Sequence, residues 1–125
     1  MNMKMLVGMY NAPKNKRYKS FAVQAADNET VWALAEAEGE DVVRQENVYV
    51  WPMKEFVEMY RPAAVAVEMD VHDFKEACRA RIGREDFIIH VFPNDVDSCD
   101  IYASELLECM QENWIVLSER QPIVC

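Results

Sequence analysis

Residues 48–92 read VYVWPMKEFVEMYRPAAVAVEMDVHDFKEACRARIGREDFIIHVF, and this stretch decides the fold. Three apolar runs rich in strand-forming residues are separated by two segments in which apolar residues recur every three or four positions, as in an amphipathic helix. The predicted strands are 48–51, 63–69 and 86–92. The run 86–92 is apolar almost throughout, which indicates a central place in a sheet. Strand thus alternates with helix, and this favours an α/β (α+β) fold.

The two helical segments of this stretch have recognisable ends. Pro52 opens the first, where its missing N–H costs little, and Pro62 stops it. Asp70 is the expected N-cap of the second helix, 71–82. Gly83 follows that helix and is expected at its C′ position.

On the N-terminal side, residues 13–26 predict a helix, because aromatic and small apolar residues recur at spacings of three and four while Lys and Arg fill the other face. Residues 30–38 then predict a strand with partial alternation. A turn at Glu38-Gly39 leads to a second expected strand, 41–45, that pairs back on the first.

On the C-terminal side, polar residues 94–100 predict a loop. A short strand, 101–103, leads into a helix at 104–114. Residues 114–117 are expected to add a final strand, and 118–125 are expected to form a tail.

These elements predict a two-layer sandwich. We expect a mixed, mostly antiparallel sheet of five or six strands, with three or four helices packed mainly on one face. The 125 residues have the size of one domain, expected to span 1–125 with its core in 13–117.

The formal net charge of −9 is unevenly distributed. Residues 1–26 carry five basic side chains and no acidic one, whereas the rest of the chain carries 8 basic and 22 acidic side chains. An acidic surface of this kind repels the phosphate backbone of nucleic acid and attracts a basic protein partner. The sequence has no apolar run long enough to span a membrane and no signal-peptide pattern, so we expect no membrane association and a cytoplasmic protein.

Motifs for catalysis, cofactors and metals are missing. The chain has neither G-x-G-x-x-G nor G-x-x-x-x-G-K, so no nucleotide cofactor is predicted. His72 and His90 lack a histidine at i+4, so no metal site is predicted, and the apolar neighbours of His90 indicate a structural role. The four cysteines show no C-x-x-C spacing and are expected to be free thiols, with Cys99 the most exposed. No residue is assigned a catalytic role.

Acidic side chains gather in two places, and these are the candidate binding residues. One group surrounds the expected turn at 38–39, and the other lies in the loop 94–100. Both are interpreted as solvated turns or, alternatively, as contacts for a basic partner. Asp95 and Asp97 have the spacing of two calcium-loop ligands, but Cys99 and Leu106 occupy later ligand positions, so no calcium site is predicted. The candidates are Glu36, Glu38, Glu40, Asp41, Asp95, Asp97 and Asp100.

The succession of RYKSF (17–21), ADNETVWALAEAEG (26–39), VYVWPMKEFVEMY (48–60), MDVHDFKEA (69–77) and VFPNDVDSCDIYASELLECMQ (91–111) resembles the small bacterial domain-of-unknown-function family 2750. The resemblance covers about residues 15–112. It implies a fold and a bacterial setting, and it implies no chemistry. The residues that carry it are Arg17, Tyr18, Phe21, Trp32, Gly39, Trp51, Pro52, Phe74, Phe92, Pro93, Glu105 and Leu106.

Three functional hypotheses follow from the sequence. The leading one is a non-enzymatic protein-binding module that acts as an adaptor, a regulator or an immunity-type inhibitor of a basic toxin. The second is a small hydrolase or transferase with an unfamiliar site, for which His90, Cys99 and the Asp95/Asp97 pair are the residues to mutate. The third is a structural homodimer joined through sheet edges or exposed aromatic side chains.

Overall fold

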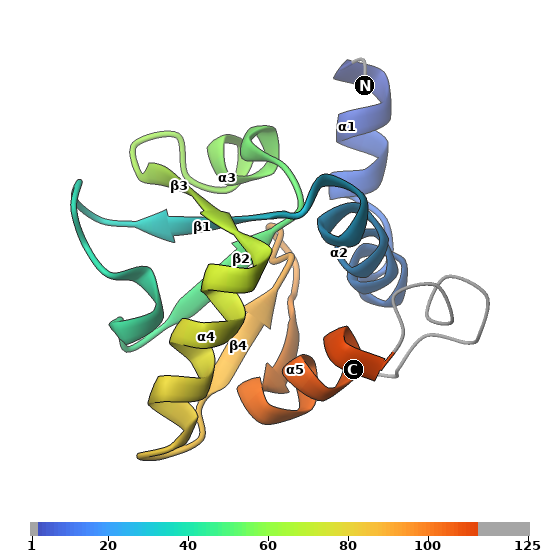
Figure 1. Cartoon of the computed structure of the whole chain (residues 1–125). Helices are drawn as coiled ribbons and strands as arrows, with labels where there is room; N and C mark the ends of the chain where they lie inside the picture. The colour runs from blue at the N-terminus through green and yellow to red at the C-terminus, as the bar shows by residue number, and fades with distance from the viewer. Residues whose placement is uncertain (1–2, 113–125) are drawn as a thin grey trace.

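The computed structural model describes residues 3–112, which form a five-stranded sheet with helices against it (Figure 1). The strands are β1 (Thr30–Ala35), β2 (Val48–Trp51), β3 (Val65–Asp70), β4 (Ile88–Val91) and β5 (Cys99–Tyr102). The helices are α1 (Met3–Tyr10), α2 (Lys14–Asn28), the 3-10 helix η1 (Val42–Arg44), α3 (Lys54–Tyr60), α4 (Val71–Ile82) and α5 (Ala103–Glu112). The strand order is β3-β1-β2-β4-β5, with β2 and β4 parallel and the other three pairs antiparallel. The expected mixed, mostly antiparallel sheet is confirmed.

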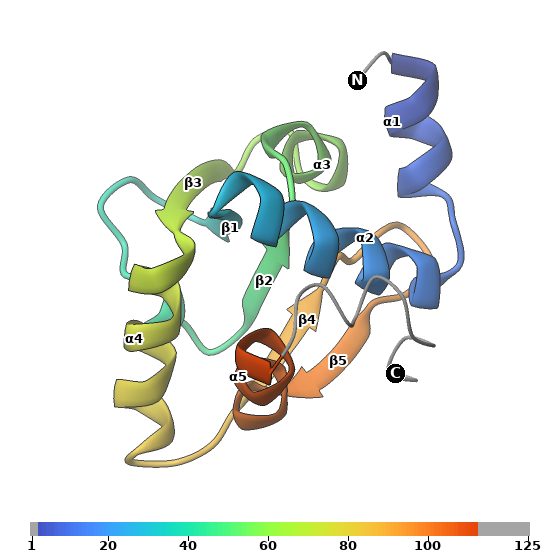
Figure 2. The same ribbon diagram turned by 45° about the vertical axis from the view of Figure 1, so that its right-hand side comes forward.

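The two faces of the sheet are covered differently. Helices α2, α4 and α5 lie against one face, the covered face (Figure 2), and its side chains, such as Val50 and Ile89, are fully buried. Alternate residues of each strand point to the opposite face. There α3 packs over only part of the sheet, where the Tyr60 and Trp51 ring centroids lie 5.3 Å apart. We call the remaining part the open face, and the two-layer sandwich is confirmed.

Two of the four expected helix ends are confirmed and two are wrong. Helix α3 ends at Tyr60, before Pro62, as expected. The Asp70 carboxylate accepts hydrogen bonds from the backbone N–H groups of His72 and Asp73, so the expected N-cap of α4 is confirmed. Gly83 occupies the C-cap with a right-handed φ of −59°, so the C′ position expected for it is wrong. Helix α3 begins at Lys54, two residues after Pro52.

The expected strand at 41–45 is wrong. Strand β1 already has β3 on one side and β2 on the other, so the sheet has no place for another partner. The segment instead forms η1, which the Asp41 carboxylate caps by accepting the Val43 N–H. Arg81 of α4 donates to the carbonyl oxygens of Val43 and Gln45 at 2.6 and 2.7 Å, and these bonds replace the ladder bonds of a strand.

Helix α1 was not expected from the sequence, and it brings the α-helices of the described residues to five. It has no acidic residue in its first turn and no basic residue in its last, and Gly8 lies within it. A helix this short is marginal alone. Leu6 and Tyr10 bury one side of it in the core, so tertiary packing stabilises it. The helix projects beyond the body of the molecule in both ribbon views (Figures 1 and 2).

A buried arginine fastens the loop 92–98. Arg17 is only 2% exposed, so its expected place on the solvent face of α2 is wrong. Its guanidinium donates to the carbonyl oxygens of Phe92 (2.9 Å), Ala12 (2.5 Å) and Asp97 (3.0 Å), and it forms an ion pair with the Asp97 carboxylate. Phe92 has a φ of 49°, a strained region for a residue with a side chain, and its N–H donates to Val50 at 2.7 Å. These bonds hold the strained turn.

The cysteines do not share one state. Cys78 and Cys109 are thiols outside any disulfide, as expected of the cysteines, whereas Cys99 is disulfide-bonded. Cys99 pairs with Val91 on the covered face and is buried, so neither the free thiol nor the exposure expected for it is correct. The strand expected at 114–117 and the tail expected at 118–125 lie outside the described residues.

Candidate functional site

The open face presents polar and apolar side chains from three adjacent strands. Tyr49 of β2, His90 of β4 and Asp100 of β5 are in register, and beside them Ile88 pairs with Tyr102. Ile88 and Tyr102 are exposed large apolar residues, and Tyr49 and His90 are half-buried. The open face is therefore available to a ligand.

His90 and Asp100 form the most chemically suggestive pair on this face. The Nδ1 atom of His90 lies 2.7 Å from Oδ1 of Asp100, and the Tyr49 ring stacks on the imidazole with centroids 4.9 Å apart. The hydroxyl of Ser98 donates to the same Asp100 oxygen. Because Ser98 bonds the carboxylate and not the imidazole, the three side chains are not arranged as a nucleophile–base–acid relay.

An acidic pocket of about 360 Å³ adjoins the open face and shares Tyr49 with it. Three glutamates, Glu36, Glu40 and Glu46, line it together with one basic residue, Arg61. A hydrogen bond closes the turn 36–40 beside this pocket: the backbone N–H of Glu36 donates to the Glu40 carboxylate at 3.2 Å. The full lining is Leu34, Glu36, Glu40, Gln45, Glu46, Asn47, Tyr49 and Arg61.

The acidic candidates at 36–41 are all exposed, but they do not act alike. Glu36 and Glu40 line the acidic pocket, whereas Glu38 does not. Asp41 caps η1 and forms an ion pair with Arg44 at 3.4 Å. The structure therefore brings Glu36 and Glu40 to the acidic pocket and Asp41 to a second hollow, and it leaves Glu38 outside both.

The acidic candidates at 95–100 each have an intramolecular partner. Asp95 accepts the Tyr10 hydroxyl at 3.0 Å, Asp97 pairs with Arg17, and Asp100 contacts His90. The three carboxylates therefore face three different groups and do not converge. Among residues 3–112, no group of three or more His, Cys, Asp or Glu residues is placed to hold a metal ion.

A second and larger hollow, about 890 Å³, lies between η1, α4 and residues 84–87. Arg44, Arg81 and Arg84 alternate around it with acidic residues, so neither sign of charge dominates. Arg81 is also engaged within the fold, since its guanidinium carbon lies 4.0 Å from the Phe87 ring centroid. This hollow gives no clear preference for a ligand of either charge.

Buried titratable groups serve packing and offer no nucleophile. Burial raises the pKa of the Cys78 thiol to about 12, and the nearby Arg81 and Arg79 only partly oppose this. Burial, and then the neighbouring Cys109, raises the pKa of the Tyr18 hydroxyl. Neither group ionises near neutral pH, so neither is an activated nucleophile.

Comparisons with protein-family models, curated proteins and solved structures find no match for this chain. Within the described part of the chain, no helix has the length and apolar character needed to cross a membrane.

The sequence did not reveal the open face. The run 86–92 looked uniformly apolar, yet β4 alternates between exposed or half-buried Ile88 and His90 and buried Ile89 and Val91. In the sequence, the available signal was His90, a polar residue between apolar neighbours. No feature of a single sequence could pair His90 with Asp100, because their contact depends on the β4–β5 register.

Proposed function

We propose that the protein is a non-enzymatic, cytoplasmic protein-binding module that receives a basic segment of a partner at the acidic pocket. The observation that carries this proposal is the wall of Glu36, Glu40 and Glu46 beside the Tyr49 ring. The roles compatible with it are adaptor, regulator or immunity-type inhibitor. The resemblance to the bacterial family given above stays a prediction and adds no chemistry.

The pocket suits a lysine or arginine side chain. Three carboxylates attract a cation, while Arg61 offsets one of them. An aromatic ring can in addition contact the alkyl stem or the face of a guanidinium. A ligand held this way binds more weakly as salt rises, because exposed charges are screened.

The test is titration of the full chain with an arginine-rich synthetic peptide at low and physiological salt. We expect Glu36→Gln with Glu40→Gln to weaken binding about tenfold, because each exposed charge pair contributes up to about 1 kcal/mol. Glu85→Gln with Glu108→Gln removes the same charge elsewhere and should have a small effect. Equal weakening by both double variants would mean that the overall charge, and not the pocket, attracts the peptide.

The His90–Asp100 pair favours one second candidate, a small hydrolase or transferase in which His90 is the general base. The carboxylate beside Nδ1 orients the imidazole and leaves Nε2 for proton transfer. Hydrolysis of an activated ester such as p-nitrophenyl acetate, compared between the parent chain and His90→Gln, tests it. A rate that this substitution leaves unchanged would remove the candidate.

A further inference from the structure

The open face carries two large apolar side chains next to each other. Ile88 and Tyr102, which we call the apolar pair, are 39% and 50% exposed. They are directly paired in the antiparallel β4–β5 ladder, so both side chains project from the same face of the sheet. Each lies two residues along its strand from His90 or Asp100, so the apolar pair and this polar pair share the open face. The apolar pair is therefore one patch and not two scattered side chains.

The apolar pair adjoins the acidic pocket. Strands β2 and β4 are parallel, and Val48 is paired with Ile89. The residues just before them, Asn47 and Ile88, therefore lie at the same level on neighbouring segments. Asn47 lines the acidic pocket, and so does Tyr49, which belongs to the open face. The pocket and the apolar pair are thus parts of one surface that runs across β2, β4 and β5.

Contacts between side chains hold the middle of this surface in place. The Tyr49 ring stacks on the His90 imidazole, whose Nδ1 lies 2.7 Å from Oδ1 of Asp100. The Ser98 hydroxyl donates to the same carboxylate oxygen. On the other side, the Tyr60 ring centroid lies 6.0 Å from that of Tyr49, and there α3 begins to cover the sheet. A surface already ordered in this way loses little conformational entropy when a ligand binds.

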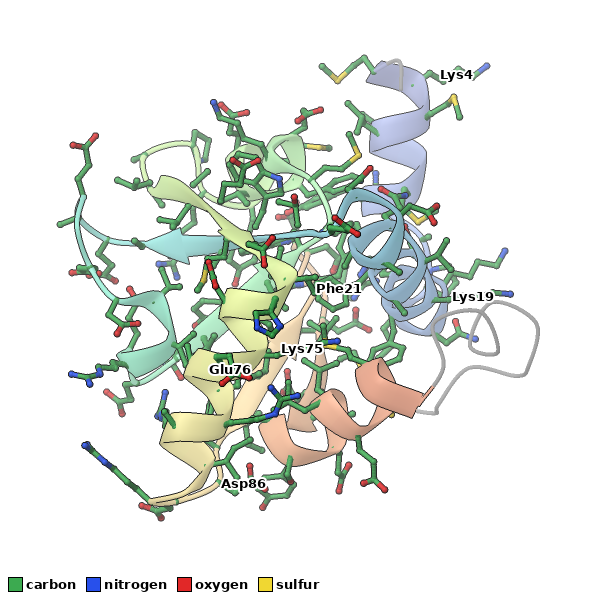
Figure 3. The ribbon with its side chains drawn as sticks, in the orientation of Figure 1. Lys4, Lys19, Phe21, Lys75, Glu76 and Asp86 are labelled. Carbon is green, nitrogen blue, oxygen red and sulfur yellow. The ribbon has the colours of Figure 1, made fainter. Side chains whose placement is uncertain are left out.

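Acidic groups without an ion-pair partner lie at the pocket end of the surface. The three glutamates of the pocket outnumber its one basic residue, Arg61, and they form no ion pair among residues 3–112. The acidic groups at the other end are engaged within the fold. Asp100 pairs with His90, and Asp86, where α4 leads into β4 (Figure 3), receives a hydrogen bond from Ser104. A cationic side chain is therefore attracted to the pocket, and the apolar pair is left to contact an apolar side chain.

We propose that the open face selects, among basic segments of a partner protein, those that carry a large apolar side chain three or four residues from the lysine or arginine. The inference rests on the proposed function and adds what the partner's sequence must contain. The basic side chain enters the acidic pocket, and the apolar side chain packs on Ile88 and Tyr102. Neighbouring strands lie about 4.8 Å apart, so the surface from β2 to β5 spans about 10 Å, which about three residues of an extended segment cover.

A protein segment fits this surface better than a nucleic acid does. A base could stack on the exposed Tyr102 ring, but each base brings a phosphate with it. The pocket glutamates and the net charge of −9 repel phosphates. A basic protein segment with an apolar side chain meets both parts of the surface without this repulsion.

The probe is a pair of synthetic peptides that differ at one position. Both contain two adjacent arginines, and three positions beyond the second arginine one peptide has leucine and the other serine. In calorimetric titrations of the full chain at low salt, we expect the leucine peptide to bind about tenfold more tightly, because its side chain becomes partly buried. Ile88→Ser with Tyr102→Ser should abolish this preference and leave binding of the serine peptide within about twofold of the parent value.

A matched control changes exposed apolar residues elsewhere. Met3→Ser with Met5→Ser alters two side chains of α1 that are 69% and 57% exposed, and it should keep the preference for leucine. Tyr102→Ser alone alters the more exposed member of the apolar pair, in the edge strand β5, and should reduce the preference to about threefold. This single variant keeps the test valid if the double variant unfolds, which urea denaturation detects.

The outcomes separate this inference from the proposed function. Glu36→Gln with Glu40→Gln should weaken both peptides to the same degree, and if it weakens neither, the proposed function fails and this inference fails with it. If it weakens both but the leucine and serine peptides bind alike, the acidic pocket stands and the inference is wrong. Loss of the preference in Met3→Ser with Met5→Ser would also contradict it. Self-association in sedimentation equilibrium that Ile88→Ser with Tyr102→Ser abolishes would overturn it by showing that the apolar pair is a dimer contact.

Discussion

Replacing Arg17 by methionine should destabilise the protein by about 3 kcal/mol. The substitution removes three hydrogen bonds to carbonyl oxygens and an ion pair with Asp97. The bond to Phe92 is fully buried, so its carbonyl would lose its partner without gaining water, at about 1–3 kcal/mol. The Asp97 side chain is 43% exposed and can rehydrate, which keeps the total below the cost of breaking a fully buried pair.

Urea denaturation followed by tryptophan fluorescence measures this loss. Arg44→Met is the matched control, because it removes an exposed arginine that, among residues 3–112, forms an ion pair with the exposed Asp41 alone, and it should cost about 0.5 kcal/mol or less. Arg17→Lys keeps the charge but not the fork of donors and should cost about 2 kcal/mol. A loss below about 1 kcal/mol for Arg17→Met would refute the view that this guanidinium fastens the loop 92–98.

Three further substitutions or reactions test other parts of the structure. Gly8→Ala should stabilise the protein by about 0.5–1 kcal/mol in thermal denaturation, because the added Cβ meets nothing, and a loss of stability would contradict the open position. Cys78, with its pKa raised by burial to about 12, should react with a disulfide reagent at pH 8 only as fast as the protein unfolds. Burial is the largest single influence on the pKa of Asp86 and raises it, but hydrogen bonds from the Ser104 hydroxyl, the Ser104 N–H and the Phe87 N–H together lower it by more. Ionised Asp86 therefore stabilises the fold at neutral pH, and this stabilisation is lost as pH falls below about 4. Asp86→Asn should flatten that acid dependence in pH-dependent denaturation, and an unchanged acid profile would refute this role.

The sequence predicted the elements whose own pattern decides them. The period of α4 and its Asp70 cap are local, and so are the apolar runs that form the strands before and after the helical segments 52–60 and 71–82. Segments whose conformation depends on distant partners were missed. Residues 41–45 have strand-forming side chains, but β1 has no free edge for them and Arg81 binds their carbonyl groups. Helix α1 has a weak local signal and exists because Leu6 and Tyr10 reach the core.

The candidate site was less predictable than the fold. Charge alone placed Glu36 and Glu40 on the surface, but the pocket they share with Tyr49 forms only when the turn at 36–41 lies against β2. Charge patterning also grouped Asp95 with Asp97, although in the fold Asp95 accepts a hydrogen bond from Tyr10 and Asp97 forms an ion pair with Arg17. Spacing along the chain cannot show which acidic groups are already bonded to a partner inside the protein.

The loop 92–98 joins parts of the chain that lie far apart in sequence, and this has a consequence for folding kinetics. Arg17 and Tyr10 contact residues 75 to 85 positions away. Contacts of such high sequence separation are costly to form early. We therefore expect the N-terminal helices to dock after the transition state, so that Arg17→Met accelerates unfolding and leaves the refolding rate nearly unchanged. A stopped-flow chevron in which refolding slows instead would place this contact in the folding nucleus.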